Sequence, residues 1–316
     1  MEGLYELLHR NVPITDTGRD SFFDVNSSHS SPGYWTAYVA RARARNLKLD
    51  SLSIPADVLD YLKALAIERA LGQQDTYPHE RRRAGAAYSP LVLLESREQT
   101  DGATSEINQC IRGLFNEVIY EEFASTICEL VGDLLDNVWA HGKSTGFSMA
   151  QKWRDPPDGF LFEFAVADCG YGFLRELQRV GITVDSHRDA IEWCIQPGNS
   201  TKKRTGDEWE QRLPPDVTGN PMGNFGRVVE SDNHHMGLGL AKLISAVEKF
   251  HGWCWLVSGD AMLCISPNGQ RTYVTLPIIW QGVALACRFN SGRVSEITTP
   301  LTADEFENIL AQLIRD

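Results

Sequence analysis

The chain has 316 residues, 42% of them hydrophobic, so it can bury the core of one large domain or of two modest ones. Its formal net charge of −12 argues against general nucleic-acid binding, because binding phosphates requires a cationic surface. The seven cysteines include no Cys-x-x-Cys pair, the start carries no signal segment, and no apolar run approaches the ~20 residues that span a bilayer, so we expect a cytoplasmic protein.

The first third of the chain predicts ordinary structure and no reactive site. Residues 24–33 read as a loop, and residues 55–72 have the apolar rhythm of one amphipathic helix that ends at a glycine. Two basic runs, 41–48 and 80–85, predict solvated faces. Short strand-like and helical pieces alternate from residue 34 onward, so we expect residues 1–115 to form a small α/β-like N-terminal region without an assigned role.

The next elements are easier to define. Residues 123–141 predict a helix whose apolar face is formed by Ile127, Leu130, Val131, Leu134 and Val138. Residues 159–168 predict a strand rich in Phe and Val, followed by the letters CGYGF. Residues 197–236 are rich in Gly, Pro, Asn and Asp and predict a long loop.

The C-terminal part begins with a second helix, residues 237–252, which starts in glycines and ends at a glycine. The Gly-Asp pair at 259–260 predicts a hairpin turn, and residues 291–316 predict a C-terminal helix. Four strand-like runs lie between these helices, at 253–258, 261–266, 272–277 and 282–289. Helices followed by a run of strands indicate an α+β two-layer domain, not a doubly wound one.

A polar stripe runs along the first helix. Glu129, Asp133, Asn137 and His141 are four residues apart and therefore lie one above the other beside the apolar face. The stripe is either a solvated helix edge or a site that holds a metal and positions a water. An amide oxygen and a carboxylate suit magnesium and proton transfer, respectively.

Two glycine-containing turns extend the second interpretation. Asp168 ends its strand and is followed by Gly170 and Gly172, which permit close approach of the backbone to a ligand. The letters GLGL at 237–240 open a helix, whose free N–H groups favour a polyphosphate. Taken singly, a simple turn and glycine packing explain these features equally well. The P-loop pattern fails because it needs glycine at Asn137, and no G-x-G-x-x-G is present.

Together, and in this order, the three motifs resemble the ATP-binding domain of the GHKL superfamily, which includes DNA gyrase, the ninety-kilodalton heat-shock chaperone, histidine kinases and mismatch-repair ATPases. DLLDNVWAH resembles its N box, DCGYG its first glycine box and GLGLAKLISAVEKFHG its second, nearest the histidine-kinase form. The resemblance implies a Bergerat-type two-layer sandwich over 116–290, with helices on a mixed, mostly antiparallel sheet.

The resemblance also implies roles for single residues. Asn137 would coordinate Mg²⁺, and Asp168 would hydrogen-bond the adenine amino group beside Gly170 and Gly172. Asp133 would be the catalytic base, where ATP-hydrolysing relatives have glutamate; it is one methylene shorter. The phosphate-binding residues would be Gly237, Leu238, Gly239 and Leu240, with residues 197–236 as the ATP lid.

Some alternatives stay open at this point. Glu129 lies one helical turn before Asp133 and is the more remote carboxylate. The threonine that relatives often place near the adenine corresponds to Val283 or to Thr275. His79 lacks the following proline and the helical hairpin of a phosphoacceptor histidine.

The sequence therefore predicts a stand-alone ATP-binding protein with ATP and Mg²⁺ as ligands. It would hydrolyse Mg-ATP slowly and use lid closure to switch an interaction with an unidentified protein partner or with a second copy of itself. The alternatives are a serine/threonine protein kinase of the anti-sigma-factor type and a nucleotide-sensing module without turnover. Neither a membrane nor a nucleic acid is an expected partner.

Overall fold

The computed structural model describes residues 3–10, 31–49, 56–138, 144–155, 159–199 and 239–299. The first elements are α1 (Gly3–Tyr5), the π-helical η1 (Glu6–Arg10), α2 (Pro32–Ala44), α3 (Ala56–Ala64), α4 (Ile67–Ala70), β1 (Val92–Leu94) and α5 (Arg97–Leu114). After the short 3-10 helix η3 (Val118–Tyr120) come α6 (Glu121–Asn137), β2 (Gly146–Arg154), β3 (Phe160–Asp168), α7 (Gly172–Arg179) and α8 (His187–Cys194). The last elements are α9 (Gly239–Lys249), β4 (Trp253–Ile265), β5 (Arg271–Asn290) and α10 (Ser291–Thr298).

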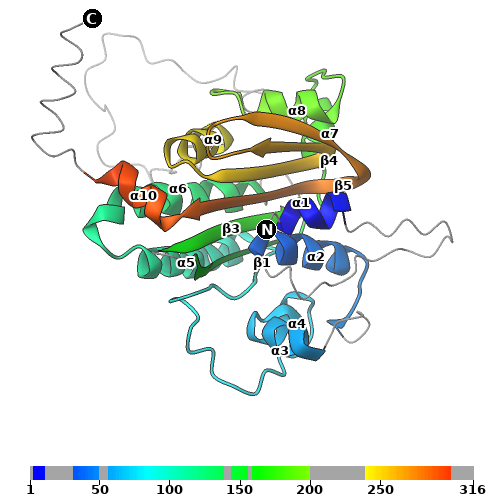
Figure 1. Cartoon of the computed structure of the whole chain (residues 1–316). Coiled ribbons are helices and arrows are strands. Elements are labelled where there is room, and N and C mark those ends of the chain that lie inside the picture. Colours follow the sequence, from blue (N-terminus) through cyan, green and yellow to red (C-terminus); the bar gives the residue numbers. More distant parts are fainter. Residues whose placement is uncertain are drawn as a thin grey trace, which may run out of the picture.

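Within the described residues the chain forms an α+β fold around a five-stranded sheet of order β1-β2-β3-β5-β4 (Figure 1). All the pairings among these strands are antiparallel, so in this part of the chain the predicted mixed sheet is wrong. Two of the four pairings join strands connected by only a few residues, β2 to β3 and β4 to β5, and such short connections permit only antiparallel neighbours. The central strand is β3, and its last residue, Asp168, is paired with Gly146 of β2.

The predicted hairpin at residues 259–260 is wrong. β4 runs without a break through Gly259, whose φ is +66°, and the register against β5 shifts between Ser258 and Ala261. A glycine in the left-handed region fits a β-bulge as well as a turn, so the local letters could not distinguish them. The four predicted strands are therefore two long ones. The actual turn follows Ile265, where Ser266 N donates to Gln270 O.

One face of the sheet is covered by α5, α6 and α9 (Figure 1), which agrees with the two-layer arrangement. Phe162, Phe164 and Val166 alternate along β3 toward these helices, as period-two side chains of a strand must. Phe123 of α6 contacts the rings of Phe250 and Phe289 in the same core. This apolar layer fixes α6 and α9 on the sheet.

The opposite face of the sheet is covered by N-terminal elements. Tyr34, Trp35 and Tyr38 of α2 are buried there against strand residues such as Ala165 and Ala286. Ser31 caps the first turn of α2 by accepting a hydrogen bond from Tyr34 N, and Pro32 occupies the first helical position. Consequently the described part of residues 1–115 packs on the sheet and also supplies its edge strand, β1.

The single helix predicted over 55–72 is interrupted. α3 ends at Ala64 and α4 begins at Ile67, with Ala66 in the left-handed region at φ 61°. Tertiary contacts satisfy backbone carbonyls at the break: Arg81 Nε donates to Ala64 O at 2.8 Å, and Leu91 N donates to Leu65 O at 2.8 Å. Arg81 is half-buried at this break, contrary to the solvated face predicted for 80–85, although Arg82 and Arg83 are exposed.

The other basic run, 41–48, is also less solvated than predicted. Arg41, Arg43 and Arg45 are half-buried, and Arg43 Nη1 donates to Leu71 O at 2.9 Å. The run belongs to the end of α2, and a helix packed on a sheet brings such side chains against its neighbours, where their stems are covered.

A buried ion pair joins the sheet to the N-terminal layer. Glu163 of β3 and Arg288 of β5 are directly opposite each other, with Arg288 Nη2 2.7 Å from Glu163 Oε2. The second carboxylate oxygen of Glu163 accepts from Gly33 N, at the start of α2, at 2.7 Å. The guanidinium also lies 5.2 Å from the ring centroids of both Trp153 and Trp255. Both charges thus have several partners in a dry environment.

None of the helices in the described residues combines the length and the apolar character that crossing a bilayer requires.

Candidate functional site

Asp168 lies at the C-terminal end of β3 and is 4% exposed. Its Oδ1 accepts a hydrogen bond from Gly170 N at 2.7 Å, which tightens the chain directly after the strand. Burial raises the pKa of Asp168 to about 7, and the backbone N–H groups of Gly170 and Val283 act in the opposite direction. A carboxyl group with so little solvation is poised to gain from a further hydrogen-bond donor.

Two glycines with positive φ let the backbone close around Asp168. A Cβ on Gly282 (φ +93°) would lie 2.5 Å from Asp168 Oδ1 and 2.4 Å from its carbonyl oxygen. A Cβ on Gly172 (φ +70°) would lie 2.9 Å from Gly282 O and from Ser258 Oγ. The Ser258 hydroxyl joins these segments, since it accepts from Phe173 N at 2.9 Å and donates to Gly282 O at 3.2 Å. Gly172 of the DCGYG motif therefore permits close packing on Gly282, which in turn packs on the Asp168 carboxylate.

The structure distinguishes the two residues considered for the position beside Asp168. Val283 follows Gly282 and donates a backbone hydrogen bond to the Asp168 carboxylate. Thr275 is paired with Ala261, beyond the bulge in β4, on another part of the long β5 strand. Val283 is thus the neighbour of Asp168, and its side chain has no hydroxyl with which to bind a ligand.

The polar stripe of the first helix lies on α6, which confirms the predicted helix up to Asn137. Asp133 is buried and Asn137 is half-buried, whereas Glu129 is mostly exposed. The stripe therefore changes from solvent-exposed to enclosed toward the C-terminal end of the helix, where Asp133 and Asn137 occupy the same edge one turn apart. His141 lies outside the described residues.

The N-terminus of α9 packs directly on that enclosed edge. A Cβ on Gly239 would lie 3.3 Å from Asp133 Cβ and 3.5 Å from Asn137 Nδ2, so glycine lets the backbone of α9 approach α6 more closely than a larger residue would. Gly239 is thereby brought beside two predicted site residues from α6. Leu240 is half-buried and packs against the apolar core instead. Gly237 and Leu238 lie outside the described residues.

The α6 edge and Asp168 lie at the same end of the sheet. A Cβ on Gly146 would lie 2.4 Å from Val138 Cγ1, so the end of α6 presses on the first residue of β2. Gly146 is paired with Asp168 in the sheet register. Gly146 thus lies between the end of α6, where Asn137 is found, and the end of β3, where Asp168 is found.

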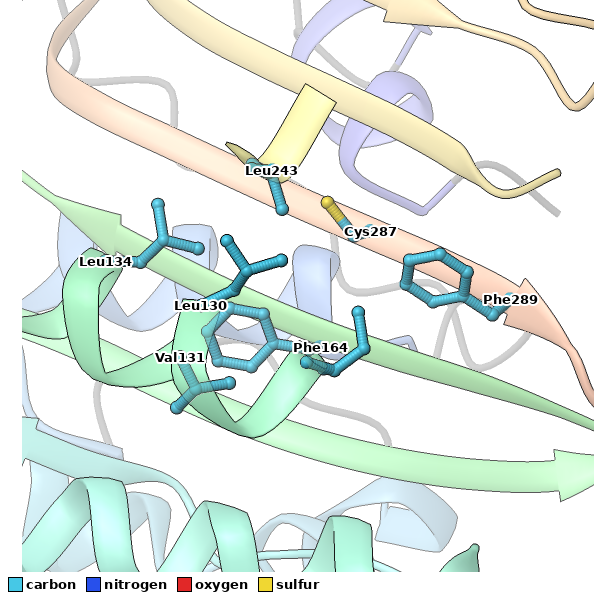
Figure 2. Close-up of a pocket in the computed structure, with 8 residues that line it drawn as sticks. Leu130, Val131, Leu134, Phe164, Leu243, Cys287 and Phe289 are labelled. Carbon is cyan, nitrogen blue, oxygen red and sulfur yellow. The ribbon is translucent and has the colours of Figure 1, made fainter. Parts of the chain in front are cut away.

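The structure also has a small apolar cavity between the sheet and two of its covering helices (Figure 2). It is lined by side chains from α6, α9, β3 and β5, namely Ile127, Leu130, Val131, Leu134, Phe164, Leu243, Cys287 and Phe289. These side chains offer no polar partner to a polar ligand or to a water. The cavity therefore belongs to the core that holds α6 against α9 and is not the ligand site.

Lys242 is a part of this region that the sequence analysis missed. Its Nζ lies 2.6 Å from Glu129 Oε1 and 3.9 Å from Asp133 Oδ2, so α9 places one cation opposite two carboxylates of α6. The hydrogen bond to Glu129 is the main cause of a raised Lys242 pKa. The sequence shows that Lys242 lies about one helical turn after Gly239. Only the packing of α9 on α6 shows that Lys242 faces Glu129 and Asp133.

The described residues include no group of three or more His, Cys, Asp or Glu side chains that could hold a metal ion. Magnesium bound together with nucleotide phosphates needs only one or two protein oxygens, and Asn137 beside Asp133 meets that requirement. The donor set is thus compatible with magnesium and ATP phosphates.

Of the segment predicted as the ATP lid, 197–236, only residues 197–199 fall within the described residues. Of the predicted C-terminal helix, 291–316, the described part contains α10.

Comparison with known proteins gives no match to a family model, to a curated protein or to a solved structure.

Proposed function

We propose that this chain binds Mg-ATP and hydrolyses it slowly. The observation that carries the proposal is the convergence of two polar elements at one end of the sheet. Asp168 is buried within glycine turns at the end of β3, and Asp133 and Asn137 of α6 lie against Gly239 at the start of α9. An adenine requires a hydrogen-bond acceptor such as the Asp168 carboxylate. A triphosphate with its magnesium suits an amide, an acid and a helix N-terminus, as Asn137, Asp133 and α9 supply.

Each residue has a definite task in this proposal. Asp168 accepts a hydrogen bond from the adenine amino group, and its burial keeps water from competing for it. The half-buried amide oxygen of Asn137, with the phosphates, would hold magnesium, which supplies charge neutralisation when bound. The N–H groups at the start of α9 would bind phosphate oxygens, and Gly239 lets this end of the helix lie close to Asp133 and Asn137.

Asp133 is the proposed base for hydrolysis. It orients a water and takes its proton as the water oxygen bonds to the γ-phosphorus. The bond between the γ-phosphorus and the β–γ bridging oxygen breaks, which yields ADP and inorganic phosphate. Phosphoryl transfer depends mainly on position and charge, so one well-placed acid is sufficient. The side chain of Asp133 is one methylene shorter than that of a glutamate base, which is consistent with slow turnover. Switching of a protein interaction by closure of residues 197–236 rests on the sequence resemblance.

The test is calorimetric titration of the protein with ATP and with GTP in the presence of magnesium. GTP has a carbonyl in place of the adenine amino group and should bind poorly. At pH 8, above the Asp168 pKa of about 7, Asp168→Asn should weaken ATP binding about tenfold or more, because a hydrogen bond to a charged group contributes ~1.5–3 kcal/mol. Asp185→Asn, at an exposed position, is the matched control.

Equal affinities for ATP and GTP would remove Asp168 from an adenine site. Phosphate release measured on the same samples separates hydrolysis from binding without turnover. Transfer of the γ-phosphate from labelled ATP to a co-purifying protein would indicate the protein kinase instead.

A further inference from the structure

Lys242 of α9 makes two contacts of different kinds with α6. Its ammonium hydrogen-bonds the exposed Glu129 at 2.6 Å and lies 3.9 Å from Oδ2 of the buried Asp133. The Lys242 side chain itself is 36% exposed, so it reaches from the surface toward the enclosed part of the stripe. The position of Asp133 and the position of Lys242 are therefore linked.

Two carboxylates of α6 share this one ammonium group. The groups that act on it electrostatically are Glu129 and Asp133, both on α6 and four residues apart. Like charges at this spacing repel each other on a helix. One ammonium between the two carboxylates relieves that repulsion and gives each a preferred direction.

We propose that Lys242 is a positioning residue for Asp133. By binding Glu129 it keeps that carboxylate at the surface, and by its proximity to Oδ2 it holds Asp133 in one orientation beside Asn137. This inference rests on the proposed hydrolytic function. It assigns Lys242 no contact with the nucleotide: the water's proton still goes to Asp133, and the leaving group is still ADP. Glu129, which Lys242 binds at the surface, is not the base in this proposal.

The chain provides a matched control for this contact. Lys249, seven residues later on α9, pairs with Glu122, seven residues earlier on α6 than Glu129. The two ion pairs join the same helices and have similarly exposed partners, but only the first is near Asp133. Loss of either pair should have the same effect on the packing of α9, so any difference between them reports on Asp133.

The experiment measures turnover and affinity separately for Lys242→Met, Lys242→Arg and Lys249→Met. Lys242→Met should lower kcat about tenfold, less than the ~10²–10⁴ lost when a general base is removed, and should leave the Kd for Mg-ATP within about twofold. Lys242→Arg should restore most of the rate, and Lys249→Met should behave as wild type. In the Asp133→Asn background, Lys242→Met should cause no further loss, because a residue that acts through another has no effect once that other is removed.

A readout without nucleotide accompanies the kinetics. The ¹³C carboxyl signal of Asp133, assigned with Asp133→Asn, should move in Lys242→Met and stay in place in Lys249→Met. An unmoved signal would overturn the inference, and so would a Kd for Mg-ATP weakened more than the rate, since that would make Lys242 a phosphate ligand. Wild-type turnover by Lys242→Met overturns the role of Lys242 alone. Absence of magnesium-dependent phosphate release from the wild type overturns both this role and the proposed hydrolysis.

Discussion

Replacing Glu163 by Gln should destabilise the protein strongly. The substitution leaves Arg288, which is 5% exposed, without its carboxylate, while the amide can still accept from Gly33 N. Removing one partner of a buried ion pair costs about 3–5 kcal/mol, because the remaining charge stays desolvated. The Trp153 and Trp255 rings lie 5.2 Å from the guanidinium with or without the substitution, so their contacts do not enter the difference between the two proteins. We therefore expect a loss of about 3 kcal/mol.

The assay is equilibrium unfolding in guanidinium chloride for Glu163→Gln, Arg288→Met and the double mutant. The double mutant should lose less than the sum of the single losses, because it leaves no unpaired charge. Glu248→Gln is the control: it removes the exposed partner of Arg271 and should cost under about 1 kcal/mol. A Glu163→Gln loss as small as the control's, or strict additivity in the double mutant, would refute the account of a buried pair. Hydrogen exchange should further show α2 opening more readily in Glu163→Gln, since Gly33 N bonds the same carboxylate.

Two further predictions concern the surroundings of Asp168. Its folded pKa of about 7 lies above its ordinary value of 3.8, so the folded state holds the extra proton and stability should fall as the pH rises from about 4 to about 7, then level off. Asp168→Asn removes this dependence; urea unfolding of both proteins between pH 4 and 8 measures it, and parallel curves would contradict the raised pKa. Gly282→Ala should cost more than Gly269→Ala, as both have positive φ but only at 282 would the Cβ meet other atoms, those of Asp168 and Gly170. Thermal unfolding of the two variants compares them, and equal losses would mean that the close approach to Asp168 carries no strain.

The sequence alone determined the elements whose side-chain pattern is local. The period of Ile127, Leu130, Val131 and Leu134 defined α6, and the dense run of Phe and Val defined β3 up to Asp168. Motif spacing also identified Asp133, Asn137 and Gly239 before anything showed that they meet. Local letters were insufficient at Gly259, where a turn and a bulge require the same positive φ.

Only the tertiary structure decided which distant residues become neighbours. Glu163 and Arg288 are 125 residues apart in the chain, and strand register makes them a pair. Lys242 faces Glu129 because α9 packs on α6 through apolar side chains. Many pairs of amphipathic helices have such side chains, so their pattern alone does not predict this contact. Such contacts depend on how long the connecting segments are and on which surfaces bury most apolar area together, and neither quantity is expressed in a short stretch of sequence.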